Sequence, residues 1–345
     1  MLHHIFGGYL PLSDRAPLRV AIVGFGDHVV KTINPCFERS NDIDVVRIYV
    51  RSPEKYVTAH PAQAGLFTGT FDEVLLDGSV DVVYVGTPIA THFDYANAAL
   101  HAGKHVWCEK SLTDNVGKTR ELVATAKARM LFLGEVSMYQ YHRQFHWIEQ
   151  QIIERQAAGE RLLGVRARFS IPELAATNIR YSRVLGGGAL LDVGYYPLSI
   201  ATALFGLPQE VLANGFTSED LQVDLSGMAL LSYVGFGCQC MWAIGSSYIN
   251  EVELSFSKTT LLISRAFSKP AGLVTKAQVI GNFGQLEDPI EIPGDDQFAN
   301  MFQAFVSAIR AGNTTIYAKF SEKCVINAML LNCVQVQIER SVSNW

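Results

Sequence analysis

A pair of glycines near the start of the chain is suited to binding a phosphate group. Gly24-Phe25-Gly26 follows the apolar run LRVAIV and precedes DHVVKT. Glycines there permit a tight turn and let backbone N–H groups approach a pyrophosphate, which the partial positive charge of the next helix start also favours. Val29 stands where the third glycine of G-x-G-x-x-G is expected, so the turn alone leaves dinucleotide binding and an ordinary glycine turn equally open. The contacts to a dinucleotide are expected from Gly24, Phe25, Gly26, Asp27 and His28.

The residues after the second apolar run indicate which dinucleotide would bind. An acidic residue about 20 positions beyond the glycines binds the ribose of NAD. This chain has YVRSPEK at that place, with Arg51, Ser52 and Lys55. Because a guanidinium and a hydroxyl suit a 2′-phosphate, we predict NADP(H) as the cofactor, in preference to NAD, bound through Arg51 and Ser52. A solvated basic residue at a strand end is the alternative interpretation.

Two histidines raise the question of a metal site. His142 and His146, in YHRQFH, stand four positions apart and would face one ion from a helix. They lack a third ligand such as the Glu of H-E-x-x-H. We therefore predict no metal site and expect a helix that faces the cleft or the solvent.

Parallel strands are expected to position the glycine turn. Continuous apolar runs occupy residues 18–26, 44–50, 80–88, 104–110 and 131–136. Helical stretches separate them, including 91–103 and 115–129, and apolar strands alternating with helices indicate a parallel sheet covered on both faces. We predict a doubly wound α/β domain of the Rossmann type over residues 18–136, preceded by an arm over residues 1–17.

The pattern changes after Val136. A helix over 145–159 leads to strands of period two, and turns such as VGFG and FSKTT join neighbouring strands closely enough for hairpins. These strands occupy residues 162–171, 210–218, 226–245, 250–267 and 277–293. A capped helix follows over 295–313. We predict an α+β domain with a large open, mainly antiparallel sheet over residues 137–345.

The bulk composition disfavours several classes of partner. The chain has 345 residues, 49% of them hydrophobic, a net charge of -5 and no basic run, so two domains and no nucleic-acid partner are expected. Asp192, Gly194 and Pro197 interrupt the longest apolar stretch, and the N-terminus lacks a secretory pattern, so we expect no membrane span. The six scattered cysteines form no CxxC pair, which favours free thiols in a reducing cytoplasm.

Two longer stretches resemble a known family. VVYVGTPIATHFDYANAALHAGKHVWCEK and then GGGALLDVGYYPL stand in this order in the glucose-fructose oxidoreductase and inositol dehydrogenase (Gfo/Idh/MocA) family, which the sequence resembles over nearly its full length. The resemblance implies hydride transfer between a nicotinamide and a hydroxyl or carbonyl carbon of a sugar or cyclitol. FSIPELAATNIRYSRVLGGGALLDVGYYPL and ISRAFSKP are most similar to the NADPH-dependent sugar 3-ketoreductases, which act on dTDP-linked deoxysugars.

The resemblance also implies roles for residues of the first stretch. It places Thr87, Pro88 and His92 on a loop beside the cofactor. Glu109 and Lys110 correspond to the start of the family's E-K-P motif, and Lys110 to its active-site lysine. Serine follows Lys110 in this chain, where proline is usual.

In the second stretch many members carry D-x-G-x-H-x-x-D. Here Tyr196 takes the position of the His and Ser199 that of the second Asp. A tyrosine there is similar to glucose-fructose oxidoreductase, dihydrodiol dehydrogenase and the ketoreductases, and disfavours the inositol dehydrogenase branch. The neighbouring Tyr195 is expected to pack.

Reduction of a ketone needs a hydride donor and a proton donor at the carbonyl oxygen. Because a free tyrosine has a pKa near 10, a nearby cation is expected to stabilise its phenolate. We hypothesise that Tyr196 gives the proton while Lys110 tunes it and orients the substrate oxygen; the reverse assignment is open. Asp192 would share a helical face with Tyr196. Its expected role is to contact substrate hydroxyls or to hold the lysine. The alternative is an acid at a helix start that interacts only with the helix dipole. Arg180 and Tyr181, on the loop before the glycines, are candidates for binding a phosphate or sugar, or ordinary surface residues.

The function predicted is an NADP(H)-dependent reductase of a keto-sugar, free or nucleotide-linked. Alternatives are a dehydrogenase of a free sugar or a trans-dihydrodiol, and a regulator that binds dinucleotide or sugar without turnover. The segment GFGCQCMWAIG is interpreted as part of an open sheet face that pairs with a second subunit in a homodimer or homotetramer.

Overall fold

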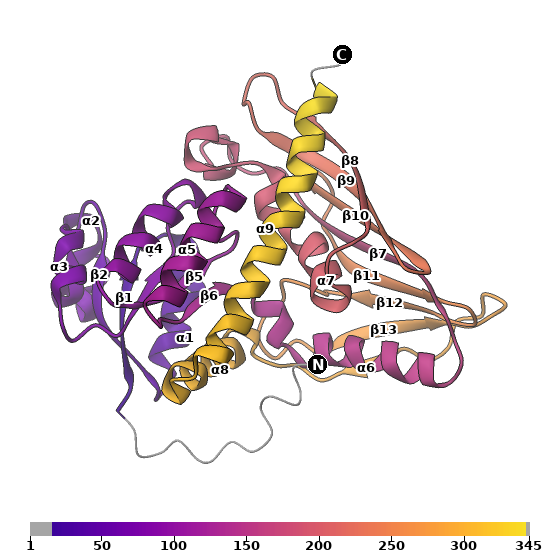
Figure 1. The fold of residues 1–345 in the computed structure, drawn as a ribbon, viewed down its shortest axis with the longest axis horizontal. Coiled ribbons are helices and arrows are strands. Elements are labelled where there is room, and N and C mark those ends of the chain that lie inside the picture. Colours follow the sequence, from indigo (N-terminus) through magenta and orange to yellow (C-terminus); the bar gives the residue numbers. More distant parts are fainter. Residues whose placement is uncertain (1–15, 343–345) are drawn as a thin grey trace.

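The first part of the chain forms a six-stranded parallel sheet. The computed structural model describes residues 16–342, so residues 1–15 of the predicted arm lie outside the described residues. The strand order is β3-β2-β1-β4-β5-β6 (Figure 1). Each predicted apolar run contains one strand, and the short β3 was not predicted. The strands are β1 (Leu18–Val23), β2 (Ile43–Tyr49), β3 (Phe67–Thr68), β4 (Val82–Val85), β5 (His105–Glu109) and β6 (Leu133–Val136).

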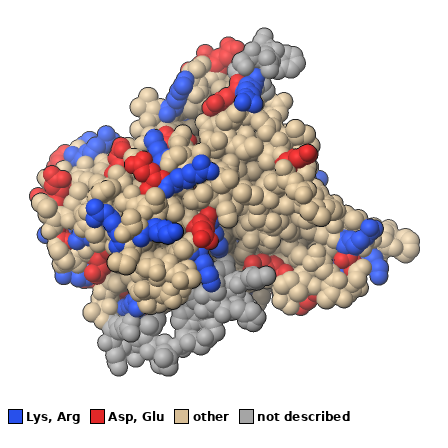
Figure 2. All heavy atoms as spheres, in the orientation of Figure 1, with Lys and Arg blue, Asp and Glu red and all other residues tan. Residues whose placement is uncertain are grey.

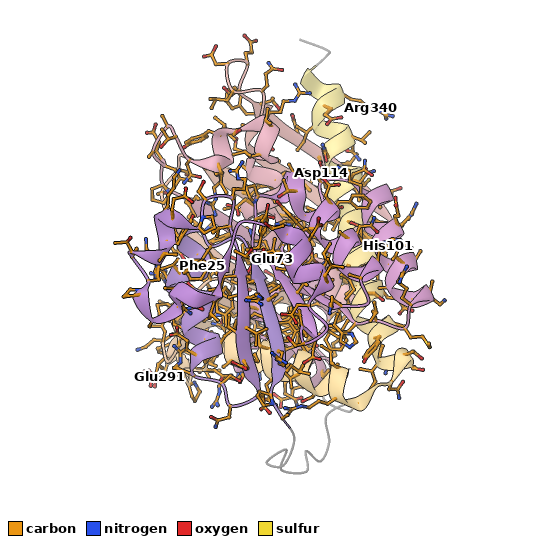
Figure 3. The ribbon with its side chains drawn as sticks, turned by 90° about the vertical axis from the view of Figure 1, so that its left-hand side faces the viewer. Phe25, Glu73, His101, Asp114, Glu291 and Arg340 are labelled. Atoms are coloured by element: carbon orange, nitrogen blue, oxygen red, sulfur yellow. The ribbon has the colours of Figure 1, made fainter. Side chains whose placement is uncertain are left out.

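Helices cover both faces of this sheet, as Figure 3 shows from its side. Successive side chains of a strand point to opposite faces, and each face of this sheet is apolar. One face packs against α3 (Phe71–Leu76), α4 (His92–His101) and α5 (Val116–Ala128). The other packs against one continuous helix made of η1 (Val29–Ile33) and α1 (Asn34–Glu38). The short α2 (Glu54–Val57) follows β2. The doubly wound α/β architecture is therefore confirmed.

The second part is built on an eight-stranded sheet in the order β14-β13-β12-β11-β7-β10-β9-β8. All neighbours are antiparallel except β7 and β10, which are parallel, so the predicted open, mainly antiparallel sheet is confirmed. The strands are β7 (Leu162–Ile171), β8 (Glu210–Thr217), β9 (Asp224–Tyr233), β10 (Phe236–Ile244), β11 (Ile249–Phe256), β12 (Thr260–Ser264), β13 (Thr275–Ile280) and β14 (Ile290–Ile292).

The inner face of this sheet packs against α7 (Tyr195–Phe205). Cys238, Cys240 and Trp242 are buried there, and the Cys240 thiol donates a hydrogen bond to the carbonyl of Pro197 at 3.0 Å. These side chains of the GFGCQCMWAIG segment thus belong to the core, not to the open face on which we expected a subunit contact. The reason is strand alternation, which sends every second residue inward.

The C-terminal helices join the two parts. The predicted helix α8 (Gln297–Ala311) begins at its N-cap Asp296 and lays Phe302 on Phe37 of α1, with ring centroids 4.7 Å apart. The long helix α9 (Thr314–Val342) was not predicted. It contacts α5 and β6 on one side and α7 and β8 on the other, and so runs between the two sheets (Figure 1). Helix α6 (Arg143–Ala157) leads from the first sheet to the second.

The surface carries mixed charge. On the face shown in Figure 2, the Lys and Arg side chains of the described residues lie interspersed with Asp and Glu. One stretch among the described residues, Arg183–Phe205, is long and apolar enough to cross a membrane, with a mean hydropathy of 1.2. In the folded protein 72% of its most apolar window is buried, as expected for a core helix.

Candidate active site

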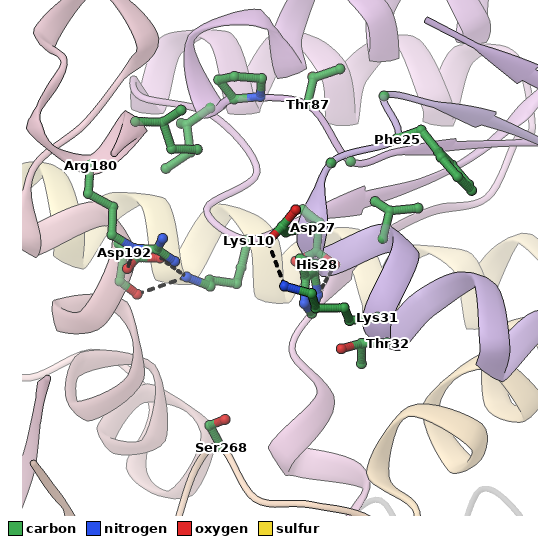
Figure 4. Close-up of a pocket in the computed structure, with 18 of the residues that line it drawn as sticks. Phe25, Asp27, His28, Lys31, Thr32, Thr87, Lys110, Arg180, Asp192 and Ser268 are labelled. Carbon is green, nitrogen blue, oxygen red and sulfur yellow. Dashed lines mark hydrogen bonds and ion pairs between the residues drawn. The ribbon is translucent and has the colours of Figure 1, made fainter. Parts of the chain in front are cut away.

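A cavity of about 1500 Å³ is lined by residues from both parts of the chain (Figure 4). Its walls are the glycine turn after β1, the loops after β2, β4 and β5, the start of α7 and the segment after β12. Ligands of doubly wound sheets bind at these carboxyl ends of the strands. Every residue predicted to bind cofactor or substrate lines this cavity, except Tyr181.

The glycine turn has the shape that a pyrophosphate requires. Gly24 has φ +88°, and a Cβ atom there would lie 2.8 Å from the Thr87 side chain and 3.0 Å from the carbonyl of Gly86, so only glycine fits. Val29 stands at the position of the third glycine and packs over Gly86. A Cβ atom on Gly86 would lie 2.7 Å from the Val29 side chain. In the motif, the third glycine lets the helix pack closely on the strand. In this chain Gly86, directly after β4, allows that close packing instead.

The residues after β2 offer cationic groups at one end of the cavity. Arg51, Ser52 and Lys55 all line it. No carboxylate of residues 16–342 forms an ion pair with Arg51 or Lys55. This arrangement suits a 2′-phosphate.

Glu109 holds a histidine of the glycine turn. The Nε2 atom of His28 lies 3.3 Å from the buried Glu109 carboxylate, which also accepts a hydrogen bond of 2.7 Å from the Tyr84 hydroxyl. Burial alone would raise the pKa of Glu109, but His28 and Tyr84 outweigh it and lower the pKa. Glu109 therefore stays ionised and fixes the half-exposed His28 beside the glycine turn. The sequence did not reveal this contact.

His92 ties two loops together. It is buried, and its Nδ1 and Nε2 atoms lie 3.0 Å from the carbonyl of Ser111 and 2.8 Å from that of Thr87. The loop after β4, with Pro88, is thereby fixed to the loop that carries Lys110. The peptide bond between Lys110 and Ser111 is cis, and the Ser111 hydroxyl donates to the carbonyl of Leu191 at 2.9 Å.

Lys110 and Arg180 share one carboxylate. The Lys110 ammonium donates to the Asp192 side chain at 2.6 Å and to its backbone carbonyl at 2.9 Å. The Arg180 guanidinium forms a two-pronged ion pair with the same side chain (Figure 4). Burial alone would raise the pKa of Asp192, but the charges of Lys110 and Arg180 hold it well below the ordinary range. Asp192 is therefore an anion that positions both cations.

Tyr196 lies directly beside this ion cluster. The Lys110 ammonium is 5.0 Å from the centroid of its ring, and the nearest partner of its hydroxyl is the Met138 sulfur at 3.9 Å. Burial raises the pKa of Tyr196 well above its usual value, and the charges of Asp192 and Glu109 raise it further. The pKa is thus raised, not lowered as expected from Lys110, because burial of the phenol and the nearby Asp192 and Glu109 carboxylates disfavour the phenolate.

The adjacent tyrosine belongs to a buried network that sequence reasoning missed. The Tyr195 hydroxyl donates to Glu135 of β6 at 2.7 Å and accepts from the Asn327 amide of α9 at 3.1 Å. Glu135 also accepts from the backbone N–H of Leu112 at 2.7 Å, two residues beyond Lys110. No pattern along the chain links these residues, since they lie on four separate segments.

Two other predictions concern residues outside the ion cluster. The Tyr181 hydroxyl accepts a hydrogen bond from the backbone of Leu174 at 3.1 Å, so the structure does not bring Tyr181 to the site.

His142 is buried and caps α6 by accepting from the N–H of Gln144 at 2.9 Å. In the described part of the chain no group of three or more His, Cys, Asp and Glu could hold a metal ion.

Two family models match the chain. Residues 18–135 match the Gfo/Idh/MocA model described as an oxidoreductase family with an NAD-binding Rossmann fold. Residues 133–261 match the model of the Gfo/Idh/MocA C-terminal domain.

Similar proteins include several sugar reductases. A dTDP-3,4-didehydro-2,6-dideoxy-alpha-D-glucose 3-reductase of Streptomyces violaceoruber is 32% identical and covers 85% of each chain. The corresponding enzyme of Actinomadura kijaniata is 30% identical over 94% of this chain and 96% of its own. A crystal structure of a 3-ketoreductase from Actinomadura kijaniata, in complex with NADP and TDP-benzene, has a TM-score of 0.86 at 29% identity, covering 93% of this chain and 98% of that one. With both domains matched and the fold shared, this chain belongs to the Gfo/Idh/MocA family of oxidoreductases.

Proposed function

We propose that the protein is an NADPH-dependent reductase of a nucleotide-linked keto-sugar. The observation that carries this proposal is the placement of a buried phenol, Tyr196, beside the Lys110–Asp192 ion pair in one cavity. The similar reductases named above support it, because they act on dTDP-linked keto-sugars.

The residues present suit NADP(H). The cradle at Gly24, which a side chain would fill, suits the pyrophosphate, and Arg51 with Ser52 suits the 2′-phosphate. When bound there, the cofactor supplies the hydride.

The side chains of the site manage the proton. Tyr196, whose raised pKa keeps it protonated at neutral pH, donates its proton to the carbonyl oxygen as charge develops there. Lys110, ion-paired with Asp192, orients that oxygen and stabilises its negative charge. Asp192 acts by positioning Lys110.

The test is NADPH oxidation, followed by its absorbance, with a dTDP-linked 3-keto-6-deoxysugar as substrate. The wild-type protein is expected to turn over with NADPH in preference to NADH, and Lys110→Met is expected to bind NADPH and turn over very slowly. A protein that binds NADPH but oxidises none of it with any keto-sugar, free or nucleotide-linked, would be a binding protein and not this enzyme.

The open sheet face supports a second part of the proposal, that the protein forms a homodimer or homotetramer. Leu212 of β8 and Leu230 of β9 lie opposite each other on this face and are 68% and 50% exposed. Exposed apolar groups that line up across strands favour a protein contact.

The six free cysteines, five of them buried, support a reducing compartment, and we infer the cytoplasm.

A further inference from the structure

The cations that line the cavity fall into two classes. Eight Lys and Arg residues line it. Four of them pair with carboxylates: Lys31 with Asp27, Arg39 with Asp296, and both Lys110 and Arg180 with Asp192. The other four form no ion pair within the described residues 16–342, and these are Arg51, Lys55, Arg265 and Lys269.

The unpaired cations come from two places in the fold. Arg51 and Lys55 follow β2 in the first domain, where the 2′-phosphate of the cofactor accounts for them. Arg265 and Lys269 follow β12 in the second domain and line the same cavity. Two such cations on one short segment suit a second anionic group, separate from the cofactor.

The segment that carries the second pair is held firmly. The buried Asn250 donates to the Tyr248 hydroxyl at 3.0 Å and to the carbonyl of Ser268 at 2.8 Å, and accepts from the N–H of Phe267 at 2.8 Å. The Arg265 guanidinium lies 4.6 Å from the centroid of the Tyr248 ring. Arg265 also has φ +53°, a conformation that costs energy in a residue with a Cβ and tends to persist at functional sites.

Lys269 is a buried lysine whose side chain has more hydrogen-bond donors than it uses within the described residues. It is 6% exposed, and its ammonium donates to the carbonyls of Ala266 at 3.2 Å and Phe267 at 3.1 Å. An ammonium has three N–H groups, so one is left for a ligand. Beside it the Gln297 amide donates to the carbonyl of Lys269, while the Gln297 Oε1 atom, buried at the cavity wall, has no hydrogen-bond partner among the described residues.

A wall of aromatic rings connects these cations with the reacting groups. Tyr196, over which Lys110 lies, packs edge to face on Phe169 at 4.9 Å, and Phe169 packs on Tyr248 at 6.2 Å. Figure 4 shows Ser268 across the open space from Lys110. A ligand that extends from Lys110 along this wall therefore reaches Arg265 and Lys269.

We propose that Arg265 and Lys269 bind the diphosphate of a nucleoside diphosphate sugar, and that Gln297 Oε1 accepts a hydrogen bond from a hydroxyl group of the same ligand. This inference rests on the proposed function and assigns its substrate specificity to named residues. Arg180, the phosphate candidate from the sequence, is ion-paired with Asp192, so Arg265 and Lys269, which pair with no carboxylate of residues 16–342, are the stronger candidates for this role. Diphosphate oxygens suit a guanidinium and an ammonium, which bind them through charge-assisted hydrogen bonds.

Burial gives the site a pH signature. Burial lowers the pKa of Lys269 to about 7, although the charge of Asp295 opposes this effect. Burial and the charge of Lys269 lower the pKa of His142 to about 4. His142 therefore stays neutral at the pH of the experiment. A bound diphosphate favours the charged ammonium, so binding above pH 7 is expected to take up a proton from solution. Calorimetry of the wild-type protein in two buffers of different ionisation heat measures this uptake.

The main experiment is calorimetric titration of the NADPH-saturated protein with dTDP and with thymidine. Saturation with NADPH fills the cofactor site, so that dTDP reports on the second one. Lys269→Met is expected to weaken dTDP binding about tenfold or more and to abolish the proton uptake, with NADPH affinity unchanged. Arg265→Gln, which removes the charge at an exposed position, is expected to weaken dTDP binding as well. Lys276→Met, at an exposed lysine of β13 paired with Glu291, is the matched control and keeps wild-type affinity.

The inference is wrong if wild-type protein saturated with NADPH does not bind dTDP, or if Lys269→Met and Arg265→Gln both bind it as wild type does. Reduction of a free keto-sugar without dTDP binding would overturn only this inference and leave a reductase. Failure to reduce any keto-sugar, with dTDP binding retained through Lys269, would overturn the proposed function and leave the binding site.

Discussion

At the residue scale, two adjacent phenols have different surroundings. The Tyr195 hydroxyl lies in a hydrogen-bond network with Glu135 and Asn327. Among residues 16–342, the Tyr196 hydroxyl has only the Met138 sulfur as a hydrogen-bond partner, and Tyr196 lines the cavity. The first is bound within the protein, and the second is available to a substrate.

Substitution of each tyrosine by phenylalanine is expected to separate these roles. Tyr196→Phe removes the proposed proton donor and is expected to lower kcat by roughly 100- to 10,000-fold with little change in stability. Tyr195→Phe leaves Glu135 and Asn327 short of a partner and is expected to lower the free energy of unfolding by about 1–3 kcal/mol, with kcat within a few-fold of wild type. Steady-state kinetics and urea denaturation of both variants measure this. If Tyr196→Phe keeps wild-type kcat while Lys110→Ala loses activity, Lys110 is the acid.

Asp192 makes stability depend on pH through its two cations. Its pKa is lower in the folded protein than in the unfolded chain, so the carboxylate stabilises the fold fully above about pH 4, and this contribution is lost as the pH falls below that value. The difference in unfolding free energy between wild type and Asp192→Asn is therefore expected to be largest at neutral pH and to shrink in acid. Denaturation of both proteins between neutral pH and pH 3 tests this; a difference that does not vary with pH would contradict the ion pairs.

Arg51 is expected to set the choice of cofactor. Arg51→Ala removes a partner of the 2′-phosphate and is expected to raise the KM for NADPH roughly tenfold or more while the KM for NADH is unchanged. Lys127→Ala, at an exposed lysine of α5, is the control. Equal effects on both cofactors would assign Arg51 a structural role instead.

At the element scale, a buried amide of α9 links β6 of the first sheet to α7 of the second domain. Asn327 donates to Glu135 of β6 and to Tyr195 of α7, and accepts from the Thr202 hydroxyl at 2.7 Å. The same Glu135 holds the loop after Lys110 through Leu112. The helix that the sequence did not predict thus supports the loop that carries Lys110.

Asn327→Ala is expected to lower the free energy of unfolding by about 1–3 kcal/mol, because it leaves buried polar groups without a partner. Gln335→Ala, which removes a half-buried side chain of the same helix whose amide bonds the exposed Glu339, is expected to change it by less than about 0.5 kcal/mol. Urea denaturation compares the two. Equal losses would mean that helix propensity, not the buried network, decides the effect.

At the scale of the whole molecule, the open sheet is the surface through which we propose that copies assemble. Its outer face has the exposed Leu212 and Leu230 at one end and the ion pairs Arg166–Glu253 and Arg168–Glu251 in the middle. Apolar groups together with paired charges are typical of subunit interfaces.

Leu230→Asp is expected to convert the oligomer to a monomer, since it places an unpaired charge in the apolar part of the proposed contact. Leu76→Asp, at a leucine of α3 that is 84% exposed, is the control and should keep the oligomer. Sedimentation velocity or light scattering gives the mass. A wild-type protein that is already monomeric at micromolar concentration would exclude the proposed interface.

The strands and most helices were predictable because their signals are local. A buried strand such as β4 is a short apolar run, and α8 has both an N-cap at Asp296 and a stop at Gly312. The two-residue β3 is too short for a pattern to show. For α9, which touches elements on two sides, no narrow apolar stripe marks the helix, because different parts of its surface are buried against different partners.

The sequence by itself determined the two-sheet architecture, the glycine turn, the cationic end of β2 and, through motifs, the pair Lys110 and Tyr196. Only the tertiary structure decided what these residues touch. Lys110 and Asp192 are 82 positions apart, and their ion pair raises no signal along the chain, because nothing local requires a lysine to meet an aspartate. The same holds for the role proposed for Arg265 and Lys269, which rests on their having no ion pair with a carboxylate of residues 16–342. Periodicity reflects the path of the backbone, whereas charge pairing depends on which segments the fold brings together.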